Sequence, residues 1–514
     1  MARTEQGKSL FGTGIRRICA VAAASTAAEM TLLVRAGLRE TPTIELRLDW
    51  LRSDSERSRF LLWLKRNRPR SATFLATCRR RAGGGKLSGG IQSELHWLAQ
   101  AREAGCSWCD LEIETLRDLP RSKKLSELGL PPRILLSLHD FQRMPSRLEA
   151  LQSAAHPDAA AVKIAAHAHT IRDSLRLLRV ASRSPNLVAV PMGEVGLPAR
   201  ILALREGSIL AYAPIGEATA PGQVSLHALK HLYRAHELSR RTRVYGVIGD
   251  PVGHSLSPLL HNTGFSARKM DAVYLPFLVK NLRDFLKAVP ELGIRGFSVT
   301  IPHKQSILKH LKECEPLAAE IGAVNTVVVR SDGSLFGCNT DYIGILRALE
   351  KKLKFAGSRV LIFGAGGVAR AGAFALAKAG ANVAICARRE TAARELAKAV
   401  GGEVVPQRSL RSEIFDAILN ATPIGMHPHD KTSPLAPREL NCRIVMDLIN
   451  RPQITQLLKF AARKGIATVS GVEMFIPQGV AQWELWTGQR APESVMRKAV
   501  LRALRSEEKS RQHS

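Results

Sequence analysis

Eight short apolar runs in the first half of the chain constrain its fold more than any other feature. Segments with helical periodicity, such as residues 91–105, separate these runs. Apolar strands that alternate with helices are typical of a parallel sheet, and eight such repeats are typical of a closed (β/α)8 barrel, or TIM barrel. We therefore expect this barrel to cover residues 15–235. The runs lie at residues 17–25, 42–50, 72–78, 107–114, 134–141, 160–166, 187–194 and 209–216.

The first run has two interpretations. Basic residues, an apolar stretch and small residues in RRICAVAAASTAA (residues 16–28) imitate a secretory signal peptide. The same letters fit a core strand followed by a helix capped at Ser25 or Thr26, with Glu29 completing a capping box. Because the apolar stretch is short and rich in alanine, we favour the strand and the capped helix.

Polar side chains gather at the predicted carboxyl ends of these strands, where barrels of this kind carry their chemistry. Lys163 stands inside the apolar run AAVKIAA. Burial lowers the pKa of a lysine, and a neutral amine can form a Schiff base with a ketone. A lysine with a buried stem and a solvated head is the alternative. The other polar residues at these ends are Glu45, Arg47, Arg79 and His139.

A polar segment, residues 235–243, predicts a linker to a second half with two lobes, residues 243–350 and 351–504. We expect the last helix to pack back on the first of these lobes. The composition of the tail from Arg505 onward predicts disorder.

The second lobe opens with a strand, a glycine turn and a helix, the arrangement of a Rossmann dinucleotide site. Glycine lets the backbone approach a pyrophosphate at the helix N-terminus. The next strand ends in Arg388 and Arg389, which suit the 2′-phosphate of NADP, although exposed arginines are common in so basic a chain. The turn residues are Gly364, Ala365, Gly366, Gly367 and Val368.

The formal net charge of +30 fits anionic small substrates, a nucleic acid or a membrane surface. The basic residues are scattered and form no nucleic-acid-binding pattern, and no stretch is apolar enough to span a membrane, so we expect neither partner. Cys106 and Cys109 lack a second pair at zinc spacing, so we expect core packing, no metal and a reducing cytoplasm. The oligomeric state stays open.

Seven ordered motifs in the second half resemble the shikimate dehydrogenase family. They lie at residues 244–262, 296–304, 321–328, 337–344, 419–426, 445–452 and 471–488.

This resemblance implies NADPH-dependent reduction of 3-dehydroshikimate to shikimate, with quinate as an open alternative substrate. It makes Lys304 and Asp341 the catalytic pair, which suits a carbonyl that needs a proton as it accepts a hydride. It also places Leu448 and Gly471 at the cofactor. The implied substrate-binding residues are Ser255, Ser257, Thr300, Asn325, Asp341 and Gln478. Ser298 and Asn450 replace the asparagine and tyrosine usual in the family, so we expect altered affinity.

Motifs in the first half resemble type I 3-dehydroquinate dehydratase, so the whole chain resembles the fused dehydratase and dehydrogenase. These motifs are IELRLD, SLHDF, VKIA, PMGEVG and TAPGQVS.

This second resemblance implies that Lys163 forms the Schiff base and that His139 removes the neighbouring proton and helps to expel water. Gly83 stands where the family usually has a glutamate close to that histidine. This departure leaves an inactive barrel scaffold beside an active dehydrogenase as the alternative; a second alternative is a non-enzymatic chain that binds polyanions. The implied substrate-binding residues are Glu45, Arg47, Arg79, Arg200, Thr219 and Gln223. Arg47 has a further interpretation as an ion-pair partner of Glu45 or Asp49.

Overall fold

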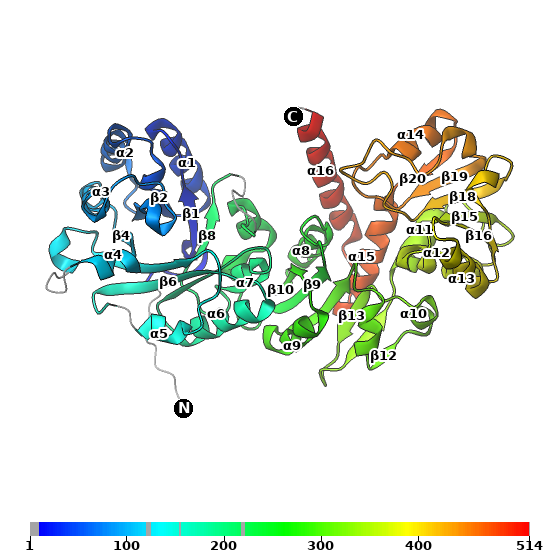
Figure 1. Ribbon diagram of the computed structural model, residues 1–514, viewed down its shortest axis with the longest axis horizontal. Coiled ribbons are helices and arrows are strands. Elements are labelled where there is room, and N and C mark those ends of the chain that lie inside the picture. The colour runs from blue at the N-terminus through cyan, green and yellow to red at the C-terminus, as the bar shows by residue number, and fades with distance from the viewer. Residues whose placement is uncertain (1–9, 120–124, 154–155, 217–221, 513–514) are drawn as a thin grey trace. The chain divides into compact units, whose positions relative to one another are not determined.

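The computed structural model describes residues 10–119, 125–153, 156–216 and 222–512 (Figure 1). The chain divides into two compact units between Thr242 and Arg243, and the segment Arg283–Ala288 groups with the first unit. Within the described residues, no helix combines the length and the apolar character needed to cross a bilayer.

The first unit is built on one sheet of eight parallel strands, which confirms the predicted (β/α)8 architecture. The hydrogen-bonded order is β7-β6-β5-β4-β3-β2-β1-β8, a nearly closed barrel. Between β7 and β8, the Ile209 amide donates to the Leu187 carbonyl at 2.9 Å, and the Ala189 amide donates to the Ser208 hydroxyl at 3.0 Å. The strands are β1 (Ile18–Ala22), β2 (Thr43–Arg47), β3 (Thr73–Thr77), β4 (Trp108–Glu112), β5 (Arg133–Asp140), β6 (Ala159–His167), β7 (Leu187–Met192) and β8 (Ala211–Pro214).

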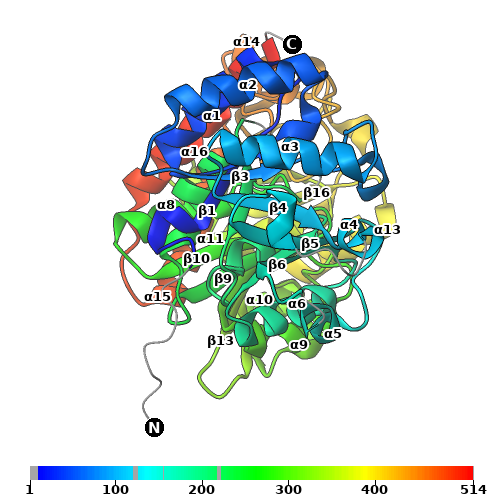
Figure 2. The same cartoon turned by 90° about the vertical axis from the view of Figure 1, so that its left-hand side faces the viewer.

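Helices cover the outside of the barrel, as Figure 2 shows for α1, α2 and α3. Thr26 and Glu29 form the predicted capping box of α1, so the strand and capped helix are confirmed at the first run. The helices are α1 (Ala27–Glu40), α2 (Asp54–Asn67), α3 (Ile91–Glu103), α4 (Ile113–Asp118), α5 (Leu148–Ser153), α6 (Ile171–Arg183) and α7 (Leu197–Leu202). Short helical turns lie at Gly14–Arg17, Leu48–Trp50, Arg81–Gly83, Leu125–Leu128, Ala228–Leu232 and Ala235–Glu237.

Apolar side chains close the end of the barrel that lies opposite the carboxyl ends of the strands. Phe11 stacks on Trp108 with 4.3 Å between ring centroids, and both side chains are buried. Cys106 and Cys109 are buried free thiols, which confirms core packing for this pair. This end, which we call the floor of the barrel, is therefore a packed apolar core. The polar side chains lie at the other end, where the strands have their carboxyl ends.

The second unit begins with a mixed sheet in the order β10-β9-β11-β13-β14-β12. The central pairs β10·β9 and β9·β11 are parallel, and β13 runs antiparallel to β11. The strands are β9 (Arg243–Gly249), β10 (Ala272–Leu278), β11 (Ile294–Val299), β12 (Glu313–Cys314), β13 (Thr326–Val329) and β14 (Leu335–Cys338). The helical segments are α8 (Ser257–Ala267), α9 (Leu282–Leu292), a 3-10 turn (Ser306–His310) and α10 (Pro316–Ile321).

A second sheet in this unit is wholly parallel, with the order β17-β16-β15-β18-β19-β20. This is the doubly wound order of a Rossmann fold, and the glycine turn follows its first strand, as predicted. The strands are β15 (Arg359–Phe363), β16 (Asn382–Cys386), β17 (Glu403–Val404), β18 (Phe415–Asn420), β19 (Cys442–Asp447) and β20 (Ala467–Val469). The helical segments are α11 (Asp341–Leu349), α12 (Gly367–Lys378), α13 (Glu390–Val400), α14 (Gln456–Arg463) and short turns at Gln407–Ser409 and Pro437–Glu439.

Two long helices complete the unit, α15 (Gly471–Thr487) and α16 (Glu493–Gln512), and the second corrects a prediction. The tail from Arg505 is helical as far as Gln512 instead of disordered. The prediction of disorder was wrong because it rested on the polar composition of the tail alone, and the residue that stabilises the helix, Arg451, is distant in sequence. Glu507 forms two hydrogen bonds of 2.7 Å with the guanidinium of Arg451, and the buried Leu504 anchors the preceding turn in the core.

Candidate active sites

Lys163 lies inside the barrel, only 4% exposed, and has a carboxylate partner that the sequence analysis missed. Its Nζ donates a hydrogen bond to Asp110 on β4, and the Ser137 hydroxyl donates to the same carboxylate. Burial alone would raise the pKa of Asp110, but the charges of Lys163 and Arg79 outweigh it and hold that pKa below its usual value. A buried carboxylate that stays ionised therefore faces the lysine.

The imidazole of His139 is held on both sides. Arg79 Nη2 lies 2.9 Å from Nε2, and Glu112 Oε2 lies 3.1 Å from Nδ1. An arginine can only donate, so Nε2 accepts and the proton sits on Nδ1, where it is donated to Glu112. Burial, together with the charge of Arg79, lowers the pKa of His139 well below its usual value. The ring is neutral at neutral pH and can act as a base.

Glu112 occupies the place beside His139 that the sequence analysis left without a carboxylate. Gly83 cannot supply that group, and the structure provides it from β4 instead. Arg79 Nε lies 2.5 Å from Glu112 Oε1, and burial raises the pKa of Glu112 against the opposing effect of Arg79. His139 therefore has an acidic neighbour, Glu112, even though Gly83 replaces the glutamate usual in the family.

The remaining predicted barrel residues lie in different surroundings. Glu45 is buried and accepts a 2.7 Å hydrogen bond from Thr77, a neighbouring strand residue. Arg47 makes hydrogen bonds of 2.9 and 2.8 Å with Asp49, so its ion-pair interpretation is realised with that residue.

The segment that follows β7 supplies one more buried cation. Arg200 on α7 is buried, and its Nε donates to the Pro191 carbonyl at 3.3 Å. Burial lowers the pKa of Arg200 to about 10. Gln223 lies in the segment after β8, and Thr219 lies outside the described residues.

In the second unit, Lys304 and Asp341 form an ion pair of 2.6 Å between Nζ and Oδ2. Lys304 follows β11, and Asp341 is the first residue of α11. Asn325 donates to the other carboxylate oxygen at 2.8 Å, which orients the aspartate toward the lysine. These three predicted residues therefore lie together as one polar cluster.

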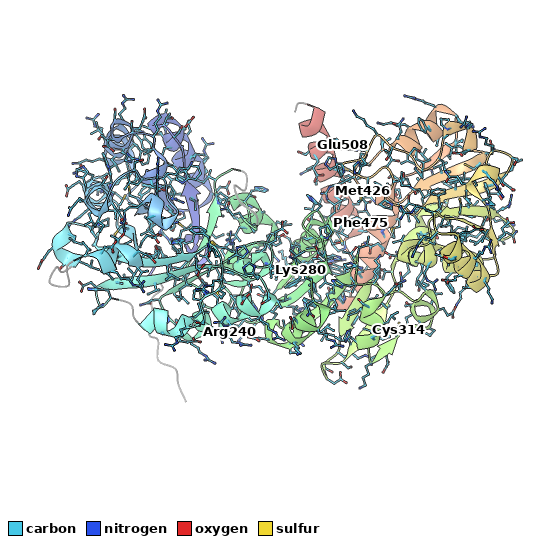
Figure 3. All side chains as sticks on the ribbon, viewed as in Figure 1. Arg240, Lys280, Cys314, Met426, Phe475 and Glu508 are labelled. Carbon is cyan, nitrogen blue, oxygen red and sulfur yellow. The ribbon has the colours of Figure 1, made fainter. Side chains whose placement is uncertain are left out.

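The other predicted substrate residues come from three segments of this unit. The Ser257 amide donates to the Ser255 hydroxyl at 3.2 Å at the start of α8. Thr300 directly follows β11. Gln478 of α15 is buried, and its Nε2 donates to the carbonyl of Phe475, which Figure 3 labels, at 2.9 Å.

The two positions that depart from the dehydrogenase family differ in their contacts. The Ser298 hydroxyl accepts from Tyr274 at 2.6 Å and donates to Gln482 at 2.8 Å, so it is part of a buried network. The buried Oδ1 atom of Asn450 has no hydrogen-bond partner in the part of the chain that the structure describes. Asn450 thus keeps a free acceptor and Ser298 does not.

The glycine turn after β15 fits a dinucleotide. Gly364 has φ +124°, and a Cβ there would lie 3.0 Å from the Ala421 carbonyl oxygen. A Cβ at Gly366 would meet no atom within 4 Å, so the space above the turn is open. Gly367 begins α12, and its Cβ position lies 3.6 Å from Lys304 Cδ. The turn therefore borders the lysine and aspartate pair.

Further residues predicted at the cofactor lie at the same edge of the Rossmann sheet. Arg388 and Arg389 follow β16, with no carboxylate of the described residues in ion-pair range. Leu448 follows β19, and its carbonyl oxygen lies 2.7 Å from the Cβ position of Gly471. Two guanidinium groups without a carboxylate partner among the described residues suit the 2′-phosphate of NADP.

Comparisons with known proteins match each half of the chain to the family that its motifs resemble. Residues 18–240 match the family described as type I 3-dehydroquinase. Residues 247–327 match the shikimate dehydrogenase substrate binding domain, and residues 471–501 match the shikimate 5′-dehydrogenase C-terminal domain. A chloroplastic bifunctional 3-dehydroquinate dehydratase/shikimate dehydrogenase from Arabidopsis thaliana is 35% identical over 477 residues, 88% of this chain and 78% of that protein. The chain belongs to this bifunctional family.

Single-activity relatives match the second half. The shikimate dehydrogenase (NADP(+)) of Methanothermobacter thermautotrophicus is 43% identical over 282 residues, which are 52% of this chain and 99% of that protein. A shikimate 5-dehydrogenase from Thermus thermophilus, solved with NADP(H) and shikimate, is 35% identical. It has a TM-score of 0.48, and the match covers 51% of this chain and 99% of that one.

Proposed function

We propose that this bifunctional enzyme dehydrates 3-dehydroquinate to 3-dehydroshikimate in its barrel and reduces that product to shikimate with NADPH in its second unit. The observation that carries the proposal is that each unit holds a lysine against a carboxylate: Lys163 with Asp110 in the barrel, and Lys304 with Asp341 in the second unit. We further propose residues 15–235, 243–350 and 351–504 as the barrel, substrate-binding and cofactor-binding domains. Separate assays with 3-dehydroquinate, and with 3-dehydroshikimate and NADPH, test the two activities.

In the barrel, the ammonium of Lys163 must first release one of its protons, and the resulting amine adds to the ketone carbon of the substrate. With one proton taken up, the ketone oxygen leaves as water, and an iminium cation joins the lysine to the substrate. The ionised carboxylate of Asp110 lies against this nitrogen and stabilises its positive charge. Buried cations at Arg79 and Arg200 suit the substrate carboxylate.

His139 acts next as the proton carrier. The iminium acidifies the neighbouring C–H bond, and the neutral imidazole accepts that proton while the electron pair forms an enamine. The enamine expels the hydroxyl group, which takes a proton from His139 and leaves as water. A water molecule then adds to the conjugated iminium carbon, and cleavage of the C–N bond releases 3-dehydroshikimate and returns Lys163 as the ammonium. Glu112 accepts a hydrogen bond from the Nδ1–H group throughout, so Nε2 is the nitrogen that exchanges protons with the substrate. For this exchange, Arg79 must turn from Nε2 to the bound substrate.

Glu112→Gln is expected to lower kcat for dehydration about 10- to 100-fold, because the amide cannot stabilise the imidazolium that forms on His139. A Cβ at Gly83 would lie 3.6 Å from Glu112 Cγ at ordinary contact distance, so a side chain fits there. Gly83→Glu should therefore recover part of the lost rate in the Glu112→Gln background. Steady-state kinetics of the single and double variants measure this, and an unaltered kcat in Glu112→Gln would show that His139 works without this partner.

In the second unit, bound NADPH supplies the hydride for the carbonyl carbon. Lys304 donates the proton that the carbonyl oxygen needs, and Asp341 holds the ammonium in position. Asn325 fixes the carboxylate, and Ser255, Ser257, Thr300 and Gln478 are proposed to bind the substrate carboxylate and hydroxyls. The glycine turn with Val368 would hold the pyrophosphate, Leu448 and Gly471 would border the nicotinamide, and Arg388 and Arg389 would hold the 2′-phosphate.

Arg388→Ala is expected to raise the KM for NADPH and to leave the use of NADH nearly unchanged. Charge-assisted hydrogen bonds to the 2′-phosphate should favour NADPH by about 2 to 4 kcal/mol in the wild type. Arg394→Ala is the matched control, since Arg394 is an exposed arginine of α13 that pairs with Glu390. Equal losses with both cofactors would contradict the assignment of Arg388.

A further inference from the structure

Tyr212 of β8 is an aromatic side chain of the barrel interior that the mechanism above does not use. In the parallel register, Tyr212 lies beside Cys19 of β1. Its ring packs on the buried cluster that includes Leu135 and Val188, which forms the floor below Lys163. The side chain therefore rises from the apolar floor toward the polar cluster at the strand ends.

The ring of Tyr212 presents its face to the reacting amine. Lys163 Nζ lies 5.0 Å from the ring centroid, within the range of a cation–π contact. Such a contact is strong where the cation is withdrawn from water, and Lys163 is almost fully buried. The lysine nitrogen thus has an ionised carboxylate and an aromatic face as its two sources of charge stabilisation.

Formation of the iminium changes how strongly the Asp110 carboxylate and the Tyr212 ring each stabilise the charge on the nitrogen. An ammonium carries three N–H donors, whereas an iminium carries the same charge with one N–H and a planar, poorly hydrated nitrogen. The single hydrogen bond from the nitrogen to Asp110 can persist only if the one remaining N–H still points at that carboxylate. An aromatic face needs no donor and stabilises a planar cation equally well, so its contribution persists as the iminium forms.

The hydroxyl of Tyr212 gives a second, independent reason to expect a ligand beside this side chain. It is buried and has no hydrogen-bond partner among the residues that the structure describes. Burial, reinforced by the neighbouring Cys19 and Glu45, raises the pKa of this hydroxyl well above its usual value, so it remains a neutral donor. Buried donors are normally paired, and a ligand oxygen in the barrel would satisfy this one.

Resting on the proposed dehydratase function, we propose that Tyr212 is a catalytic residue of the barrel. Its ring stabilises the positive charge on the Lys163 nitrogen as the iminium forms, and its hydroxyl donates a hydrogen bond to an oxygen of the bound substrate.

Two substitutions separate the two roles. Tyr212→Phe keeps the ring and removes the hydroxyl, whereas Tyr212→Met fills similar space without a ring. Leu210→Val is the matched control, because Leu210 belongs to the same buried cluster two residues earlier and offers no ring to Lys163. Each full-length variant is incubated with 3-dehydroquinate and borohydride, and the rate at which the reduced adduct appears on Lys163 is followed by mass spectrometry, alongside kcat, KM and thermal unfolding.

We expect Tyr212→Met to slow adduct formation about 10- to 30-fold, which corresponds to about 1.4 to 2 kcal/mol. Tyr212→Phe should form the adduct within about threefold of the wild-type rate and raise the KM about 3- to 10-fold. Leu210→Val should lower the unfolding temperature and leave the rate of adduct formation unchanged.

Adduct formation at the wild-type rate in a folded Tyr212→Met variant would overturn the role of the ring. An unchanged KM in Tyr212→Phe, which preserves the shape of the side chain, would overturn the role of the hydroxyl even if Tyr212→Met does not fold. A wild-type protein that forms no adduct would instead refute the dehydratase function on which this inference rests.

Discussion

Lys163→Ala is expected to abolish the dehydration of 3-dehydroquinate and to leave the reduction of 3-dehydroshikimate intact. Without the amine no Schiff base can form, and the loss should be at least about 10³-fold because covalent steps depend on the nucleophile itself. Lys163→Arg should be equally inactive, since a guanidinium keeps the charge beside Asp110 but is not a nucleophile.

Removal of the lysine also leaves a buried carboxylate unpaired. The barrel of Lys163→Ala should lose about 3 to 5 kcal/mol of stability, the usual effect of removing one partner of a buried ion pair. Lys163→Ala combined with Asp110→Asn should regain much of this stability and remain inactive. This pair of variants separates loss of the nucleophile from loss of the fold.

Borohydride trapping supplies the direct evidence. The wild-type protein should carry a reduced substrate adduct on Lys163, and both Lys163 variants should carry none. Dehydration that survives in Lys163→Ala would contradict the covalent mechanism. A wild type without adduct at saturating substrate would favour the inactive barrel scaffold.

Lys304→Ala has the second large expected effect, a fall of about 10²- to 10⁴-fold in the reduction rate, the range usual for a general acid. Cofactor binding should persist, because the change removes proton transfer and not the glycine turn at Gly366. Asp341→Asn should lower kcat less, since an amide can still contact the ammonium. The double variant should lose little more than Lys304→Ala if the pair acts as one unit.

Single-turnover kinetics and NADPH fluorescence titration check this prediction, with the dehydratase activity of the same protein as the internal control. A parallel fall in both activities would indicate misfolding or coupled sites instead of a lost proton donor.

The barrel was predictable because its signal is repetitive. Each strand run is apolar and each lies before a helical segment, so eight local patterns point to one architecture. Lys163 and His139 stood out against these runs. The carboxylates Asp110 and Glu112 were missed, although they stand two residues apart on one strand and therefore share its inner face.

Other features depend on contacts between distant residues. The helix beyond Arg505 is held by Arg451, which lies 56 positions before its partner Glu507, and its own polar composition resembles a solvated tail. The contact between Tyr212 and the Lys163 ammonium joins two strands that are not hydrogen-bonded neighbours. Sequence pattern and composition predict neither contact. The contact between Tyr212 and Lys163 depends on closure of the barrel, and the contact between Arg451 and Glu507 depends on how the last helix packs.

One coupled assay tests the central claim that a single chain performs both reactions. The purified protein is supplied with 3-dehydroquinate and NADPH, and the absorbance of NADPH is followed with Lys163→Ala as the control. The wild type is expected to consume NADPH with shikimate formed in equal amount, whereas Lys163→Ala should do so only when 3-dehydroshikimate is added. A wild type that oxidises NADPH with 3-dehydroshikimate and never with 3-dehydroquinate would contradict the account.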